Sequence, residues 1–175
     1  APRLGLMSGK GIMAMNAVTL FGAPYSVYVR ICRITLAEKG VRHTLEPVDV
    51  FSDDGVPPAH LQRNPFGRIP TFDHDGFGLF ETDAIVHYID DVFDGPALQS
   101  DDPRRRARMR QIMRIADSEL YTKGVWGAFV PWSREGTAAD LEPVERSLAI
   151  IQDLAGSNLL TGNQVTLADP YVYAT

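Results

Sequence analysis

The sequence predicts an α/β domain over residues 17–93, a linker over residues 94–102 and an all-helical domain over residues 103–175. Two observations support this division. Short apolar or β-branched runs alternate with helical periodicity in the first part, whereas the apolar patterns beyond the linker repeat at three- and four-residue steps. The linker itself, DGPALQSDD, is crowded with acids, glycine and proline, a composition typical of segments that join domains.

The first part opens with a strand, a helix and a second strand. Residues 17–22 read AVTLFG, an apolar run with β-branched residues that ends at glycine and predicts a buried strand. From Ser26 apolar residues recur at helical spacing as far as EKG, where Gly40 is placed to end a helix. Residues 41–50 finish with β-branched residues and predict a second strand. A strand that follows a helix in this way favours a right-handed parallel crossover, so the unit is βαβ.

The rest of the first domain predicts two more strands and a helix. Residues 51–61 are rich in Asp, Gly and Pro and predict a loop, with at most a short helix over residues 59–63. Two short strand candidates, 69–72 and 78–80, flank an Asp-Gly turn and predict an antiparallel hairpin. Apolar residues at helical spacing then predict a helix over residues 81–93. The order of the whole domain is therefore βαβ followed by ββα.

The second domain carries two apolar stripes at helical spacing and the start of a final helix. Thr166 and Asp169 in the motif TLAD predict a capped N-terminus, because a threonine cap and an acid three residues later can satisfy free amides. The helix that they open reaches Thr175 after a few residues, so we expect the helical bundle to be truncated. One stripe comprises Met109, Ile112, Met113, Ala116 and Leu120, and the other comprises Leu141, Val144, Leu148, Ile151 and Ala155.

Composition and charge exclude several classes of protein. With 45% hydrophobic residues among 175, the chain can fill a core, and its net charge of -5 has the wrong sign for a protein that covers phosphates. No segment approaches the roughly 20 apolar residues of a membrane helix. The single cysteine, Cys32, excludes an internal disulfide and a redox dithiol, which favours a reducing, cytoplasmic location. Residues 1–16 are set aside as a leader that is either disordered or an expression remnant.

Several separated motifs together resemble the cytosolic glutathione transferases. The run NPFGRIPTFDHDGFGLFETDAIVHYID over residues 64–90 resembles the corresponding stretch of that family, and the EKG end of the first helix and the TLAD motif match in order. The resemblance extends from about Ala17 to Thr175. It implies a thioredoxin-like N-terminal domain, a helical C-terminal domain, glutathione as co-substrate and no bound cofactor.

The resemblance places the glutathione site on the same run. An Ile69-Pro70 bond entering a strand suggests a proline in cis, and the family pairs the backbone at Ile69 with the cysteinyl part of glutathione. Glu81 and Thr82 at a helix start favour an anion, and the resemblance implies that they hold the γ-glutamyl end. Arg68 could contact the peptide or its carboxylates. Each residue also has a structural reading, since the fold requires the Ile-Pro pair and Glu81-Thr82 could merely cap a helix.

Ser26 is predicted to supply the hydroxyl that stabilises the glutathione thiolate, because a hydroxyl near a helix N-terminus can donate a hydrogen bond to sulfur. The stretch GAPYSVYVRICRITLAEKG aligns without a gap on the phi class of the family, whose catalytic serine lies four residues after the glycine. Tyr25 is the alternative candidate for the catalytic hydroxyl. Ala23 stands where the omega and zeta classes carry their critical cysteine or serine. Cys32 is interpreted as a small buried thiol. His60, near the expected glutathione loop, is a further candidate contact.

Aromatic and basic residues of the second domain allow two readings each. Tyr121, Trp126, Phe129 and Trp132 either pack around a helix end or, as the resemblance implies, form an apolar pocket for the second substrate. The arginine run of the first helix could suggest a nucleic-acid patch, but its residues point several ways around the helix, which favours a solvated face or a subunit contact. This arginine run comprises Arg104, Arg105, Arg106, Arg108, Arg110 and Arg114.

The histidines of the chain do not show the spacing of metal ligands, so the sequence predicts no metal site.

The activity that the resemblance implies is that of a glutathione transferase, which conjugates the glutathione thiolate to an electrophilic, largely apolar substrate by proximity and thiolate stabilisation. Two alternatives stay open. One is a non-catalytic interaction module of the same fold, and the other is a glutathione-dependent peroxidase or isomerase that uses the same thiolate on another acceptor. The family also implies a homodimer that pairs the first domain of one subunit with the helical domain of the other. Neither nucleic acid nor a membrane is an expected partner.

Overall fold

The first half of the chain builds a four-stranded mixed sheet. The structure, a computed structural model, describes residues 17–156 and 158–175, so the predicted leader lies outside the described residues. The strand order is β2-β1-β3-β4, with β1 parallel to β2 and antiparallel to β3, which confirms the predicted βαβ-ββα order. The elements are β1 (Val18–Phe21), α1 (Val27–Glu38), β2 (Thr44–Glu46), α2 (Pro58–Arg63), β3 (Thr71–His74), β4 (Phe77–Phe80) and α3 (Thr82–Val92).

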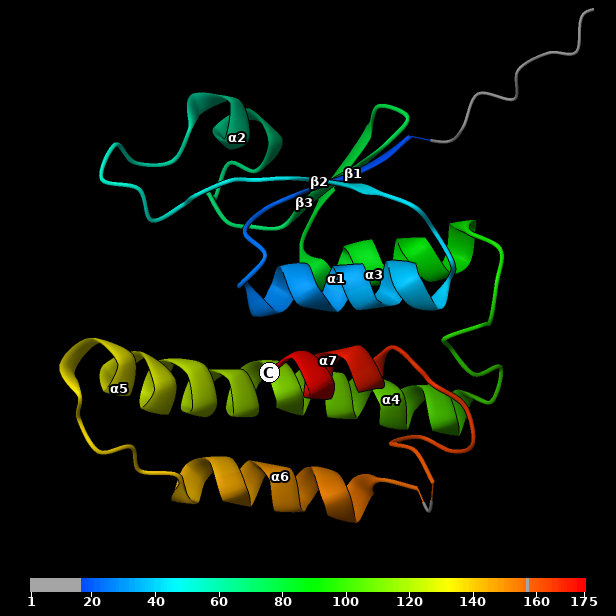
Figure 1. The fold of residues 1–175 in the computed structure, drawn as a ribbon. Helices are drawn as coiled ribbons and strands as arrows, with labels where there is room; N and C mark the ends of the chain where they lie inside the picture. The colour runs from blue at the N-terminus through cyan, green and yellow to red at the C-terminus, as the bar shows by residue number, and fades with distance from the viewer. Residues whose placement is uncertain (1–16, 157) are drawn as a thin grey trace, which may run out of the picture.

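Helices cover both faces of this sheet: α1 and α3 lie against one face and α2 lies over the other (Figure 1). Leu20 of β1 stands opposite Phe72 of β3, and both side chains are almost completely buried. Strand β2 is shorter than the predicted range 41–50. Beyond its last residue the chain stays hydrogen-bonded next to β1, because Gly22 N–H donates to the Glu46 carbonyl at 2.9 Å and Val48 N–H donates to the Gly22 carbonyl at 3.4 Å.

Helix α1 begins and ends where its sequence signals predict. Ser26 is the N-cap, and its Oγ accepts a long hydrogen bond of 3.5 Å from a backbone N–H in the first turn. At the other end Gly40 has a φ of 68°, and the N–H groups of Gly40 and Val41 donate to the carbonyls of Ala37 and Leu36. These two bonds form a Schellman ending, for which a glycine in the left-handed region is the preferred residue.

The second half is all helical, as predicted, but it contains one element that the sequence did not predict. Helix α4 continues without a break into a π-helical stretch, η1, and then into α5, so one helical segment spans residues 103–135. Such long π-helical stretches are rare in proteins. The elements are α4 (Pro103–Ile115), η1 (Ala116–Phe129), α5 (Val130–Glu135), α6 (Glu142–Leu154) and α7 (Ala168–Ala174).

The TLAD motif opens α7, and the predicted acid satisfies a free amide, whereas the predicted threonine side chain caps no amide of the helix. The Asp169 carboxylate accepts hydrogen bonds from the backbone N–H and the hydroxyl of Thr166, at 2.7 and 3.0 Å. The residues of the predicted apolar stripe on α4 and η1 are buried, whereas those of the predicted stripe on α6 are only partly buried, so that prediction is partly wrong. Leu148 is 43% exposed, while its neighbour Ser147 is 5% exposed. Helix α6 is the outermost helix of the second half (Figure 1) and packs against η1 and α4.

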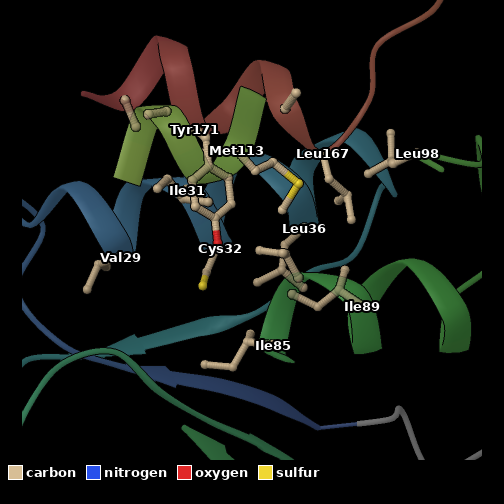
Figure 2. Packing of buried hydrophobic residues seen from close by; sticks show 14 of the residues in the cluster. Val29, Ile31, Cys32, Leu36, Ile85, Ile89, Leu98, Met113, Leu167 and Tyr171 are labelled. Atoms are coloured by element: carbon tan, nitrogen blue, oxygen red, sulfur yellow. The ribbon is translucent and has the colours of Figure 1, made fainter. Parts of the chain in front are cut away.

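One hydrophobic core joins the two halves. Helix α7 lies against α1 and α4, and Leu167 and Tyr171 belong to the same buried cluster as Ile31 and Leu36 of α1 and Met113 of α4 (Figure 2). The proposed boundary at residues 94–102 therefore separates the elements, while the core continues across it. Within the described ranges, no helix is both long enough and apolar enough to cross a membrane.

Candidate functional site

A cavity of about 730 Å³ lies where the two halves meet. Its walls come from α1, the loop before β3, the start of α3, the continuous segment α4-η1 and α7. This volume is in the range of cavities that hold a small molecule. The cavity is lined by Tyr28, Asn64, Arg68, Ile69, Pro70, Glu81, Thr82, Asp83, His87, Arg110, Met113, Arg114, Asp117 and Tyr171.

The loop before β3 forms one wall. The Ile69-Pro70 peptide bond is cis, as the sequence predicts. The Arg68 carbonyl is held from behind, because it accepts hydrogen bonds from Asn64 Nδ2 at 2.8 Å and from His60 Nε2 at 2.9 Å. The backbone of Ile69 makes no hydrogen bond to any other residue of the described chain. Its N–H and C=O are therefore available to a ligand with an extended backbone.

The start of α3 forms a second wall. Glu81 takes the N-cap position with a φ of 72°, and its side chain makes no capping hydrogen bond. Thr82 follows as a buried residue. The first amides of a helix have no partner inside the helix, and the helix dipole adds a partial positive charge at this end. An uncapped helix start that borders a cavity is therefore a favourable place for a carboxylate.

A hydrogen-bonded group on the opposite side links the two halves. The Tyr28 hydroxyl on α1 donates to Asp117 Oδ1 on η1 at 2.8 Å, and Arg114 Nη1 donates to Asp117 Oδ2 at 2.8 Å. Tyr121 packs against Tyr28 with 4.7 Å between ring centroids. Burial, followed by the hydrogen bond to Asp117, raises the pKa of Tyr28 above its ordinary value. The phenol thus stays protonated and acts as a donor at neutral pH.

The cavity carries charges of both signs. Glu81 and Asp83 lie at the start of α3, while Arg68 and Arg110 contribute guanidinium groups that form no ion pair within residues 17–156 and 158–175. His87 Nδ1 donates to the Asp83 carbonyl at 2.8 Å. Such a mixed set of charges suits a ligand with both an ammonium and carboxylates. In the described part of the chain, no three His, Cys, Asp or Glu residues lie close enough together to hold a metal ion.

Comparisons with known proteins identify the family. Residues 20–97 match the model of the glutathione S-transferase N-terminal domain. The chain is 32% identical over 150 residues to a protein named maleylacetoacetate isomerase from Pseudomonas aeruginosa, an alignment that covers 80% of this chain and 71% of that protein. The chain belongs to the glutathione S-transferase family. Its thioredoxin-like domain followed by a helical region is the glutathione S-transferase fold.

Two further matches show how widely this glutathione S-transferase fold is used. A delta-class glutathione transferase from Nilaparvata lugens has a TM-score of 0.79 and 26% identity, with 90% of this chain and 76% of that chain covered. Elongation factor 1-gamma from Carassius auratus is 30% identical over 165 residues, which cover 89% of this chain but only 36% of that protein. The matches therefore include transferases and a protein with a different name and a much longer chain.

Five of the residues predicted for glutathione line the cavity of this glutathione S-transferase fold, namely Arg68, Ile69, Pro70, Glu81 and Thr82. The other predicted residues lie elsewhere. His60 is almost completely buried behind the loop and contacts the Arg68 carbonyl, so it supports the wall rather than lining it. Ser26 caps α1 and is not among the residues that line the cavity. Its rival, Tyr25, is 61% exposed.

The four aromatic residues predicted for the second substrate do not line the cavity in the described structure. Trp126, Phe129 and Trp132 are exposed, and the rings of Phe129 and Trp132 pack against each other. These three residues follow Asp117 along η1 and α5, beyond the part of the helix that borders the cavity. Tyr121 lies closer, stacked on Tyr28.

Other residues of the cavity were missed by the sequence analysis. Arg110, Met113, Arg114 and Asp117 line it at intervals of three, four and seven residues, which is one face of a helix. Arg110 and Arg114 are exposed, as the predicted solvated face requires, but they also border the cavity, which the sequence analysis did not predict. The helical spacing of these four residues is a sequence signal that could have grouped them.

Proposed function

We propose that this protein binds glutathione in the cavity and transfers its thiolate to an electrophile. The observation that supports the proposal most directly is the pairing of an unbonded Ile69 backbone beside cis-Pro70 with the uncapped start of α3 on one cavity. The backbone of Ile69 matches the extended cysteinyl unit of the peptide. The amides at Thr82 match the γ-glutamyl carboxylate, and Arg68 is available for the glycyl carboxylate.

Ser26 is the proposed donor to the glutathione sulfur, as in a serine-type, phi-like enzyme. Its Oγ accepts a weak hydrogen bond from α1, which leaves the hydroxyl proton free to donate. The dipole at the start of α1 also favours an anion. On binding, the thiol proton passes to solvent. With an aryl halide, a sulfur–carbon bond then forms and the carbon–halogen bond breaks, with its electron pair leaving on the halide. Met113 and Tyr171 would contact the apolar part of this substrate.

Two measurements test the proposal. Calorimetry with millimolar glutathione should show binding by the folded, metal-free protein, and turnover should be measurable with an aryl halide. Ser26→Ala should lower kcat by roughly one to two orders of magnitude, because losing a hydrogen bond to an anion typically costs ~1.5–3 kcal/mol. Glutathione affinity should change little, since the hydroxyl acts on the sulfur and not on the ends of the peptide.

Tyr25→Phe is the matched control and should leave kcat and glutathione affinity close to those of the unmodified protein. The thiolate absorbance of bound glutathione should fall at neutral pH in Ser26→Ala alone, because the pKa of the bound thiol rises toward that of the free peptide. Loss of this absorbance in Tyr25→Phe with retention in Ser26→Ala would refute the serine assignment.

A second candidate function is a glutathione S-transferase fold that serves as a non-catalytic interaction module. Two observations favour it: Ser26 does not line the cavity, and most of this chain aligns with elongation factor 1-gamma. Glutathione binding without turnover of aryl halides, peroxides or isothiocyanates would support it.

Isomerisation is a third candidate, favoured by the match to maleylacetoacetate isomerase, and it would use the same thiolate. Turnover of a cis-alkene dicarbonyl compound with recovery of unchanged glutathione would identify it.

We also propose a homodimer in a reducing, cytoplasmic compartment. Cys32 is buried and unpaired, which fits such a compartment. Large apolar side chains are exposed on both halves, among them Phe51 and Phe66 in the first half and Trp132 in the second. Sedimentation at micromolar protein should give twice the chain mass of 19.3 kDa. A monomer at every concentration would rule the dimer out.

A further inference from the structure

The wall that α4 and η1 present to the cavity is mostly charged. Arg110, Met113, Arg114 and Asp117 line it, and only Met113 is apolar. The aromatic residues that could have made this wall apolar are exposed further along η1 and α5. A second substrate bound between this wall and the glutathione loop would therefore meet guanidinium groups.

The charges of this wall do not cancel. Both oxygens of Asp117 are occupied, one by the Tyr28 hydroxyl and the other by Arg114, so the charge of Asp117 is already balanced by Arg114. Arg110 makes neither an ion pair nor a side-chain hydrogen bond with any residue in the described ranges. One positive charge on the wall is thus left without a partner.

The acids of the facing wall do not neutralise this charge. Glu81 and Asp83 lie at the start of α3, and neither approaches Arg110 within ion-pair distance. In the proposed glutathione complex, these two acids are placed to meet the ammonium of the γ-glutamyl unit. The guanidinium of Arg110 is a planar group with parallel N–H donors, whose geometry matches a carboxylate.

We propose that the electrophile of this enzyme carries a carboxylate, which Arg110 binds while Met113 and Tyr171 contact the apolar part of the molecule. This inference rests on the proposed function, because it assigns the second substrate of the same site. The subsite selects substrates and takes no part in the transfer itself.

The test uses two electrophiles that differ at one substituent, the charged chlorodinitrobenzoate and its neutral carboxamide. Each is assayed with glutathione, and kcat/KM is divided by the uncatalysed rate constant for the same compound. The unmodified protein should favour the benzoate by about tenfold, as expected for one partly exposed charge-assisted contact. This preference should shrink at high ionic strength, because salt screens an exposed charge. Arg110→Gln should remove most of the preference, and Arg110→Lys should keep part of it.

Arg108→Gln is the matched control. Arg108 lies on the same helix, is exposed, donates to Gln111 and does not line the cavity, so its loss should leave the preference unchanged. A binding assay accompanies the kinetics: calorimetry measures the affinity of dinitrobenzoate, which has no leaving group, in the presence of S-methylglutathione. Arg110→Gln should weaken this affinity about tenfold and leave glutathione affinity nearly constant.

The outcomes separate this inference from the proposed function. Turnover of both electrophiles with the same preference in Arg110→Gln and the unmodified protein would overturn the inference and leave the transferase intact. A parallel loss of glutathione affinity in Arg110→Gln would also overturn it, since Arg110 would then hold a carboxylate of glutathione. If neither electrophile turned over while dinitrobenzoate binding still depended on Arg110, the carboxylate subsite would stand and the transferase proposal would fail.

Discussion

Asp117 illustrates what a single side chain contributes to this site. It accepts hydrogen bonds from Tyr28 on α1 and from Arg114 on α4, so it ties the first half of the chain to the second directly beside the cavity. Each oxygen of Asp117 accepts one hydrogen bond, and its negative charge is balanced by Arg114. Arg110 is then the residue of this helix face whose charge has no partner among the described residues.

Single residues differ in how far the sequence predicts their roles. Ile69-Pro70, Gly40 and Thr166 act through neighbours in the chain, so short motifs predict the cis bond, the end of α1 and the start of α7. Asp117 has its role because a helix from the other half of the chain lies opposite it. Separations such as the 89 residues between Tyr28 and Asp117 leave no local signal in the sequence.

The ends of α1 and α3 and the linker between the halves are held together by one buried ion pair. Lys39 Nζ lies 3.1 Å from Asp90 Oδ1, and the two side chains are 3% and 5% exposed. Lys39 also donates to the Pro96 carbonyl, while Asp90 Oδ1 accepts the N–H of Leu98. Two helices and the linker thus meet at a single charged contact.

Asp90→Ala should lower the free energy of unfolding by about 3–5 kcal/mol, because it leaves the Lys39 ammonium buried without its counter-charge. Urea titration measures this loss. Asp91→Ala is the matched control: Asp91 is exposed and makes one long contact of 3.3 Å to Gln99, so its removal should change stability by less than about 0.5 kcal/mol. Equal losses in the two variants would show that the buried pair contributes nothing beyond an ordinary surface acid.

Elements were predicted well where local signals and burial agree, as in the sheet, α1 and α3. The prediction was partly wrong for α6, whose apolar residues include the exposed Leu148. Periodicity shows that a helix has an apolar side, but the neighbours decide which part of that side is covered. Helix α6 packs against η1 and α4 on one side. Which of its apolar residues are buried depends on where these two neighbours lie, and the sequence of α6 by itself does not contain that information.

At the scale of the whole molecule, the two halves share one core and should unfold together. Leu36 of α1, Met113 of α4 and Tyr171 of α7 belong to the same buried cluster, so neither half has a complete core of its own (Figure 2). The cavity lies at this same junction, which means that its geometry depends on the two halves staying docked. The sequence predicted both halves but not their continuous core, because periodicity does not say what covers an apolar face.

The buried Cys32 and Tyr171 make this joint unfolding sensitive to alkaline pH. Burial raises the pKa of both groups above the ordinary values, which are about 8.5 for a thiol and about 10 for a phenol. The folded protein therefore keeps both protons where the unfolded chain releases them. The unfolded state then binds fewer protons, so the free energy of unfolding falls as pH rises past the ordinary pKa of each group. Below pH of about 8 these contributions are fully present.

Urea unfolding between pH 7 and 10 should show a loss that approaches about 1.4 kcal/mol per pH unit above the ordinary pKa of the thiol. Two probes follow it: fluorescence of Trp126 and Trp132 reports the helical half, and reactivity of the Cys32 thiol reports the first half. Their transitions should coincide because the core is shared. In Cys32→Ala, followed by fluorescence, the free energy of unfolding should be lower at every pH because a cavity is left in the core. It should no longer fall with rising pH below pH of about 10, because the titrating thiol is gone. Stability that rose with pH would contradict the linkage argument, and separate transitions would show that each half folds on a core of its own.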